Sequence, residues 1–193
     1  ANDETPTHMI TENGFMDRNN VEDDVLKILT IGNSFSDDTM EYIGQIAESL
    51  GVEYVLANMY IPACDIDTHW NNVDKWLPAY EYRAFINGAW VTTANTRVYD
   101  VVKKENWDYI SFQQASGTSG VADTYGNLNN LVDKVRGFAN ANAKIVWNMT
   151  WAYQSDSTHG AFVNYNNDQM TMYNAIVETV QTVIVPNERF DII

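Results

Sequence analysis

The chain has 193 residues, of which 45% are hydrophobic and 19% are charged, so it is long enough to bury the core of one ordinary domain. Its 26 acidic and 11 basic residues give a formal net charge of −15. Because this charge would repel phosphate groups, we expect neither nucleic acid nor an anionic membrane surface as a partner. No apolar stretch approaches the roughly 20 residues that a membrane-spanning helix needs.

The N-terminal residues differ in character from the rest. Residues 1–24 are polar and acidic without periodicity, which predicts a leader or tether before a single domain at 25–193. The chain starts with alanine instead of methionine, which is typical of a removed export signal or a trimmed N-terminus. We expect an extracytoplasmic protein, periplasmic or at the cell surface, with lipid anchoring left open. The single cysteine excludes an internal disulfide framework.

Strand and helix patterns alternate after residue 24. Apolar runs predict strands at 25–31, 52–60, 107–112 and 144–150, and the start of a fifth at 190–193. Helical spacing predicts helices at 34–50, 97–104, 128–138 and 168–185. Residues 61–78 are expected to form an irregular loop, and Asn87-Gly88 predicts a small β-hairpin insertion near 81–93. The pattern indicates an α/β fold with a three-layer, doubly wound parallel sheet of about five strands.

The carboxyl edge of such a sheet gathers the loops that carry function. This rule brings together the turn at Ser34, the loop at 61–70, the loop at 113–119 and the loop at 150–159. We therefore look for chemistry among these four segments.

Ser34 is the candidate nucleophile. It stands where the first strand ends and a helix opens, so its hydroxyl could attack a carbonyl while neighbouring N–H groups hold the oxyanion. The alternative is an ordinary helix cap by Ser34 or Ser36. Gln113 and Gln114 end a strand and could add an amide donor, although a buried glutamine is more often a satisfied structural group. A backbone N–H near Ala63 or Cys64 could add a second donor.

The turn and several other segments resemble a known family. Gly32-Asn33-Ser34-Phe35-Ser36 is similar to the first motif of the SGNH/GDSL hydrolase superfamily, G-[DN]-S-x-S, in which the serine follows a strand. More narrowly, the chain resembles the uncharacterised SGNH-like DUF4886 family of gut Bacteroidetes over residues 25–193. The segments that carry this narrower resemblance are 68–72 (THWNN), 107–117 (WDYISFQQASG), 147–154 and 158–160.

The resemblance implies a role for each matched position. Ser34 matches the nucleophile, and its N–H matches one oxyanion donor. The second donor falls on Ala63, where related chains tend to have glycine, and the role survives only if Ala63 keeps a negative φ. Gln113 stands where the superfamily has an asparagine donor, with Gln114 as the alternative. The implied fold is the flavodoxin-like SGNH hydrolase fold.

The resemblance also implies an Asp-x-x-His pair near the C-terminus, which supplies the general base and its carboxylate. The chain stops in the fifth strand, before that block would occur, and a serine without a base is a weak nucleophile. We expect the natural protein to continue past Ile193, because a doubly wound domain rarely ends on an uncovered strand. Otherwise the domain is not a hydrolase as it stands. For His69 and His159, substrate contact or a structural hydrogen bond is favoured over a role as base.

Aromatic residues near the predicted site favour a carbohydrate ligand, because flat rings stack on sugars; the alternative is that they fill gaps in the core. We expect no metal, since the acidic pairs at 37–38 and at 65 and 67 lack a calcium-loop pattern. No nucleotide or other cofactor is expected, because no glycine-rich phosphate loop occurs. The residues predicted to contact substrate are His69, Trp70, Gln114, Trp151, Tyr153 and His159.

These observations favour a serine esterase that forms an acyl-enzyme and removes acetyl or other small acyl groups from carbohydrate. A non-catalytic carbohydrate-binding module on the same scaffold is the first alternative. A lipase or thioesterase is the second, and it would need an apolar channel beside the serine.

Overall fold

The computed structural model of the protein describes residues 25–86 and 88–193. The leader expected at 1–24 and Asn87 of the expected hairpin turn lie outside the described residues. The next residue of that turn, Gly88, has a φ of +76°, which glycine adopts without strain.

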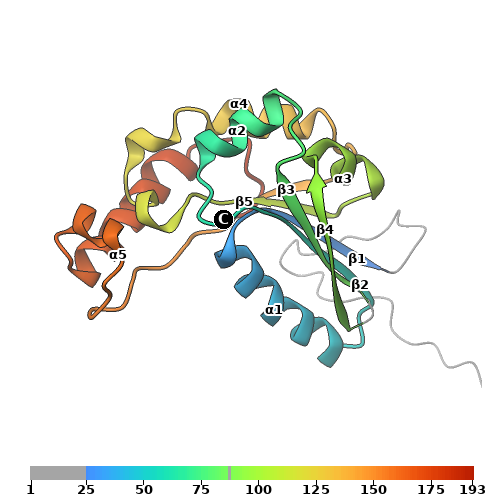
Figure 1. Ribbon diagram of the computed structural model, residues 1–193, viewed down its shortest axis with the longest axis horizontal. Coiled ribbons are helices and arrows are strands. Elements are labelled where there is room, and N and C mark those ends of the chain that lie inside the picture. Colours follow the sequence, from blue (N-terminus) through green and yellow to red (C-terminus); the bar gives the residue numbers. More distant parts are fainter. Residues whose placement is uncertain (1–24, 87) are drawn as a thin grey trace, which may run out of the picture.

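One six-stranded sheet forms the middle layer, in the order β4-β3-β2-β1-β5-β6 (Figure 1). Strands β2, β1, β5 and β6 run parallel, whereas β3 and β4 are antiparallel to their neighbours. The predicted α/β fold with a parallel sheet is therefore confirmed. The strands are β1 (Leu26–Gly32), β2 (Tyr54–Tyr60), β3 (Tyr80–Ile86), β4 (Ala89–Thr96), β5 (Tyr109–Phe112) and β6 (Lys144–Trp147).

Helices lie on both faces of this sheet. α1 (Ser34–Ser49) lies on one face, and α2 (Ile66–Asp74), α3 (Val98–Lys104) and α4 (Leu128–Arg136) lie on the other (Figure 1). The remaining helical elements belong to the loops at the carboxyl edge and to the C-terminal part. They are η1 (Ser116–Thr118), η2 (Ala122–Tyr125), η3 (Gly160–Tyr165), α5 (Gln169–Thr179) and the π-helical turn η4 (Val180–Ile184).

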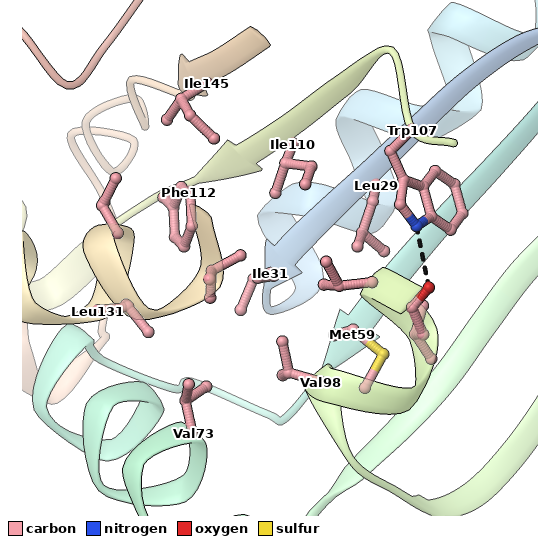
Figure 2. Packing of buried hydrophobic residues seen from close by; sticks show 14 of the residues in the cluster. Leu29, Ile31, Met59, Val73, Val98, Trp107, Ile110, Phe112, Leu131 and Ile145 are labelled. Carbon is pink, nitrogen blue, oxygen red and sulfur yellow. Dashed lines mark hydrogen bonds between the residues drawn. The ribbon is translucent and has the colours of Figure 1, made fainter. Parts of the chain in front are cut away.

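The main hydrophobic core lies between the sheet and α2, α3 and α4. Leu29 and Ile31 of β1 point into it and pack with side chains from the neighbouring strands and these helices (Figure 2). Trp107 is fully buried there, and its indole N–H donates to the carbonyl of Val101 at 3.0 Å. This packing holds the ends of β1 and β5, and hence the loops that follow them, in fixed positions.

The expectation of an irregular loop at 61–78 was wrong, because the loop contains α2. Asp65 caps this helix by accepting the N–H of Thr68 at 2.8 Å. Ile66, His69 and Val73 form its buried stripe at helical spacing. The cap and the stripe were both present in the sequence, but α2 is only nine residues long and starts four residues after Pro62.

The predicted hairpin is confirmed and has a place in the main sheet. β3 pairs with β2, with Arg83 opposite Asn58, so β3 and β4 extend the sheet at one edge. Nearly every residue of β4 is exposed on both faces. At the other edge, the fifth parallel strand expected at 190–193 is limited to one bridge between Ile192 and Val146.

Candidate active site

The four loops predicted to meet at the carboxyl edge of the sheet do meet there. Asn33 donates its side-chain N–H to the carbonyl of Cys64 at 3.3 Å, which joins the first loop to the second. Gln113, at the end of β5, donates to Asn33 Oδ1 at 2.7 Å, which joins the third loop to the first. Phe35 packs on Trp151 with ring centroids 4.3 Å apart, which brings in the fourth.

The residues before Ser34 explain the shape of the turn. A Cβ added to Gly32 would lie 2.2 Å from Ser36 Oγ and 3.0 Å from Gln113 Cδ, so only glycine fits there. Asn33 is the N-cap of α1, and its Oδ1 accepts the N–H of Phe35 at 3.1 Å. The cap is therefore Asn33, and neither Ser34 nor Ser36 plays the capping role considered from the sequence.

Ser34 is exposed at the first position of α1. The N–H groups of Phe35, Ser36 and Asp37 all bond to Asn33, through its side chain or its carbonyl. Among the described residues, neither the N–H nor the hydroxyl of Ser34 has a hydrogen-bond partner. The N–H stands at the positive end of a 16-residue helix, where a developing anion is stabilised.

Gln113 lies beneath the turn, and its side chain is 1% exposed. Its Oε1 accepts from Ser36 Oγ and from Asn148 Nδ2, the latter at 3.2 Å, while its Nε2 donates to Asn33. The side chain thus fixes the cap of α1 from below. Its role as an oxyanion donor stays a prediction.

Ala63 is exposed in the neighbouring loop, and its N–H has no acceptor among the described residues. Its φ is +51°, so the residue does not keep the negative φ that the sequence comparison required. This left-handed conformation is the one for which glycine is usual, and alanine adopts it at a cost of about 1 kcal/mol. The condition set from the sequence is therefore not met, and Ala63 stays a proposed donor only because its N–H has no acceptor among the described residues.

Gln114 and His69 lie in the interior, each 1% exposed. Gln114 accepts the N–H of Ile66 and donates to Thr124, so it ties two loops together. His69 bonds to Tyr80 through Nδ1 at 3.0 Å, and its buried Nε2 has no partner among the described residues. Burial, opposed by the charge of Asp65, lowers the pKa of His69 to about 4. Both side chains are engaged inside the fold, and their contact with substrate stays a prediction.

The aromatic candidates fall into separate places. Trp70 is half-buried and packs against the main core. Trp151 is 47% exposed beside Phe35, next in sequence to Ser34. Tyr153 and His159 form a pair of their own, with ring centroids 4.7 Å apart, and the Tyr153 hydroxyl lies 2.8 Å from Ser116 Oγ.

His159 belongs to an Asp-x-x-His sequence, Asp156-Ser157-Thr158-His159, which the sequence reasoning missed. The histidine is exposed, and its Nδ1 accepts the N–H of Ala161 at 3.1 Å. Because this nitrogen is already an acceptor, it does not donate to Asp156 as the orienting bond of a catalytic dyad would require. The Asp-x-x-His spacing is therefore present, but the hydrogen bond from His159 Nδ1 to Asp156 is not compatible with the bond that His159 makes.

Cys64 does not act as an alternative nucleophile here. The thiol is 3% exposed, and burial, together with the nearby charge of Asp65, raises its pKa to about 12. A thiol with this pKa stays neutral and unreactive at physiological pH.

A hollow of about 450 Å³ opens beside Ser34. The sequence analysis did not predict that the β3–β4 hairpin would line part of it. One wall is the N-terminal half of α1, and the other is the β3–β4 hairpin. The side chains that the hairpin contributes come from alternate positions of paired strands, which was the available signal. The lining residues are Ser34, Asp37, Asp38 and Glu41 from α1, and Arg83, Trp90 and Thr92 from the hairpin.

Asp37 is held by two partners, Arg83 from the facing wall of the hollow and the buried Asn58. Arg83 forms an ion pair with its carboxylate, and Asn58 donates to the other oxygen at 2.8 Å. Asn58 also donates to the carbonyl of Asn33 at 3.1 Å. The hairpin, β2 and the turn that carries Ser34 are therefore linked by one polar chain.

An apolar groove of about 340 Å³ lies elsewhere, between α1 and the face of β1, β5 and β6. Ile28, Met40 and Ile43 are among its lining residues, and Ser34 is not. Within residues 25–86 and 88–193, no helix is long and apolar enough to cross a membrane, and no three potential ligand side chains are grouped as a metal would require.

Several known structures are similar to this chain, while no curated protein matches its sequence significantly. A DUF4886 family protein from Bacteroides uniformis ATCC 8492 is 37% identical, with a TM-score of 0.79. The match covers 82% of this chain and 62% of the relative, so the chain spans about three fifths of that protein.

Two further structures are only 10–12% identical, with TM-scores below 0.5. TesA has a TM-score of 0.49 and 12% identity, over 86% of this chain and 76% of its own. Axe2, an acetylxylan esterase from Geobacillus stearothermophilus, has a TM-score of 0.44 and 10% identity, and the match covers 80% of this chain and 73% of Axe2. The model of a domain of unknown function, DUF4886, matches residues 27–188, and the chain belongs to this family.

Proposed function

We propose that the protein is a serine hydrolase of ester bonds, with Ser34 as its nucleophile. The observation that carries the proposal is the combination found at this one residue. The residue is exposed beside a hollow, its N–H has no acceptor among the described residues and stands at the start of a long helix, and a buried network fixes the turn from behind.

The chemistry follows from this position. Ser34 Oγ attacks the ester carbonyl while a histidine base, of the Asp-x-x-His kind that the resemblance implies, takes its proton, and the carbonyl oxygen becomes negatively charged in the tetrahedral intermediate. The free N–H of Ser34 and the helix end favour that charge. The protonated base then gives this proton to the leaving alcohol. It takes another proton from the water that attacks the acyl-serine and returns it to Ser34 Oγ as the acid leaves.

Ala63 and Gln113 complete the oxyanion site in this proposal. The N–H of Ala63 is free among the described residues, and its loop is bound to Asn33 through the carbonyl of Cys64. Gln113 Nε2 already donates one hydrogen to Asn33, so it serves through its second hydrogen or by moving away from Asn33.

The proposed substrate is an acetyl or other small acyl ester of a carbohydrate. The lining of the hollow beside Ser34 is mostly polar, with one tryptophan, and Trp151 packs on Phe35, the residue after Ser34. The apolar groove that could take a long acyl chain does not include Ser34, which disfavours a lipase or thioesterase.

Labelling with a fluorophosphonate, combined with p-nitrophenyl acetate turnover, tests the proposal. We expect the label on Ser34, and we expect Ser34→Ala to lose turnover by about 10⁴-fold or more. Ser49→Ala is the matched control, because Ser49 is an exposed serine at the far end of the same helix. Carbohydrate binding without labelling or turnover would instead identify a non-catalytic binding module.

A further inference from the structure

We infer that the sugar part of the substrate binds between α1 and the β3–β4 hairpin, stacked on Trp90 and hydrogen-bonded by Asp38 and Glu41. This inference rests on the proposed function of Ser34, and it names the substrate as a neutral, hydroxyl-rich ester. It places the main sugar contacts away from the loop of Tyr153 and His159.

The helix side of the hollow is a single stripe. The stripe begins at Ser34 and continues three, four and seven residues later with Asp37, Asp38 and Glu41. At these spacings the four side chains share one face of α1. Because a helix rises 1.5 Å per residue, the stripe extends about 10 Å from Ser34. A substrate whose ester lies at Ser34 can therefore extend along this stripe.

The hairpin presents its other side chains to the same stripe. Phe85 pairs with Trp90, and Arg83 pairs with Thr92, so these four side chains lie on one face of the two strands. Phe85 packs against α1 at Gly44, where an added Cβ would lie 3.3 Å from its ring. This contact and the Arg83–Asp37 ion pair fix the hairpin against the helix.

Trp90 is an exposed but supported ring. It is 45% exposed, and its ring centroid lies 5.2 Å from that of Phe85, which in turn stacks on Tyr54 at 5.7 Å. A ring supported in this way loses little side-chain freedom when a ligand covers its exposed part. Its apolar area and its partial exposure suit the flat face of a sugar.

The charges of the hollow exclude an anionic ligand and favour hydroxyl groups. Arg83 is already bound by Glu81 and Asp37 and lies over the ring of Tyr60, at 3.4 Å from its centroid. Asp38 and Glu41 are exposed and have no ion-pair partner among the described residues. Their oxygens are therefore free to accept hydrogen bonds from sugar hydroxyls.

Kinetics of Trp90→Ala on two kinds of ester test the inference. The probes are p-nitrophenyl acetate, which has no sugar, and a panel of partially acetylated xylan and mannan oligosaccharides. We expect kcat/KM for the best oligosaccharide to fall by about tenfold, mainly through KM, while p-nitrophenyl acetate changes by less than about twofold. Trp90→Phe should restore part of the loss.

Val91→Ala is the matched control, because Val91 is the next residue, is 50% exposed and lies on the opposite face of β4. It should leave both activities unchanged. Equal kcat/KM of Trp90→Ala and the parent on the oligosaccharides would overturn the inference, as would an equal loss on both kinds of ester. A parent that cleaves the cationic ester acetylcholine better than any oligosaccharide would overturn it too. A parent protein that neither hydrolyses any of these esters nor is labelled at Ser34 would refute the proposed function itself.

Discussion

The two sides of Ser34 are built in opposite ways. Behind it, Asn33, Ser36 and Gln113 are at most 2% exposed and are bound to one another. In front of it, Asp38, Glu41 and Trp90 are exposed, and Trp90 is supported only from one side.

This difference separates two tasks. The buried side fixes where the hydroxyl and the free N–H of Ser34 point, so a small change there alters the geometry for every substrate. The open side contributes little to the turn itself, so changes there alter which substrate fits. Mutations on the two sides should therefore differ in how much turnover they remove and in how far that loss depends on the substrate.

The largest expected effect outside Ser34 itself comes from Gln113→Ala. Loss of an oxyanion donor or of its support raises the barrier by about 3 kcal/mol, so turnover of p-nitrophenyl acetate and of sugar esters should both fall about a hundredfold or more. Gln114→Ala is the control, since that side chain joins Ile66 to Thr124 and does not contact Asn33. A Gln113→Ala enzyme with full turnover would show that the amide has no catalytic part.

The pH dependence of stability tests whether the buried His69 stabilises the folded protein in its neutral form. Its pKa is about 4 when folded and about 6.5 when unfolded, so the unfolded chain binds the proton more readily between these values. Stability should therefore fall as pH drops from about 6.5 toward 4, by up to about 3 kcal/mol, with no effect above pH 7.

Urea unfolding of the parent and of His69→Gln at pH 7 and pH 4.5 measures this effect. The variant should be less stable at pH 7, because the bond to Tyr80 is disturbed, but its stability should depend less on pH. Identical pH dependence in the two proteins would contradict the assignment.

Gly32→Ala tests how tightly the buried side is packed. The new methyl group would lie 2.2 Å from Ser36 Oγ, so either the serine or Gln113 must move. We expect a loss of about 1–3 kcal/mol in the free energy of unfolding and a loss of turnover on all substrates. Gly126→Ala is a suitable control, because a Cβ there meets no atom within 4 Å. Unchanged turnover in Gly32→Ala would show that the turn tolerates displacement.

The sequence carried enough information to predict the parallel strands, most helices and the position of Ser34. Apolar runs such as 25–31 and the abrupt Gly32-Asn33-Ser34 junction are local signals. The hollow was not predictable in the same way. Arg83 and Trp90 line the hollow beside Ser34 because β3 pairs with β2. The alternation within the hairpin is a local signal, but its pairing with the distant β2 leaves none.

Two polar residues predicted to contact substrate are buried in the structure. His69 and Gln114 lie in segments at the correct edge of the sheet, and the sequence placed them near substrate for that reason. The structure turns both side chains inward, because α2 packs its His69 stripe on the core and Gln114 binds the start of α2. Both contacts depend on α2, a helix in a segment that the sequence analysis expected to be an irregular loop.

Arg83→Met should have the smallest effect and the clearest dependence on substrate. The ion pair with Asp37 is about one quarter exposed on each side, so its loss should cost less than about 1 kcal/mol of stability. Arg83 also lies on Tyr60, and methionine keeps part of that packing. With Asp37 unpaired, the hollow becomes more negative, so esters of acidic sugars should be cleaved less well while p-nitrophenyl acetate is unaffected. Arg83→Lys keeps the charge but cannot bind Glu81 and Asp37 with one planar guanidinium group. Its activity on esters of acidic sugars should therefore lie between those of the parent and Arg83→Met. An equal loss on charged and uncharged substrates in Arg83→Met would mean that the ion pair supports the buried side, and the separation of tasks around Ser34 would not hold.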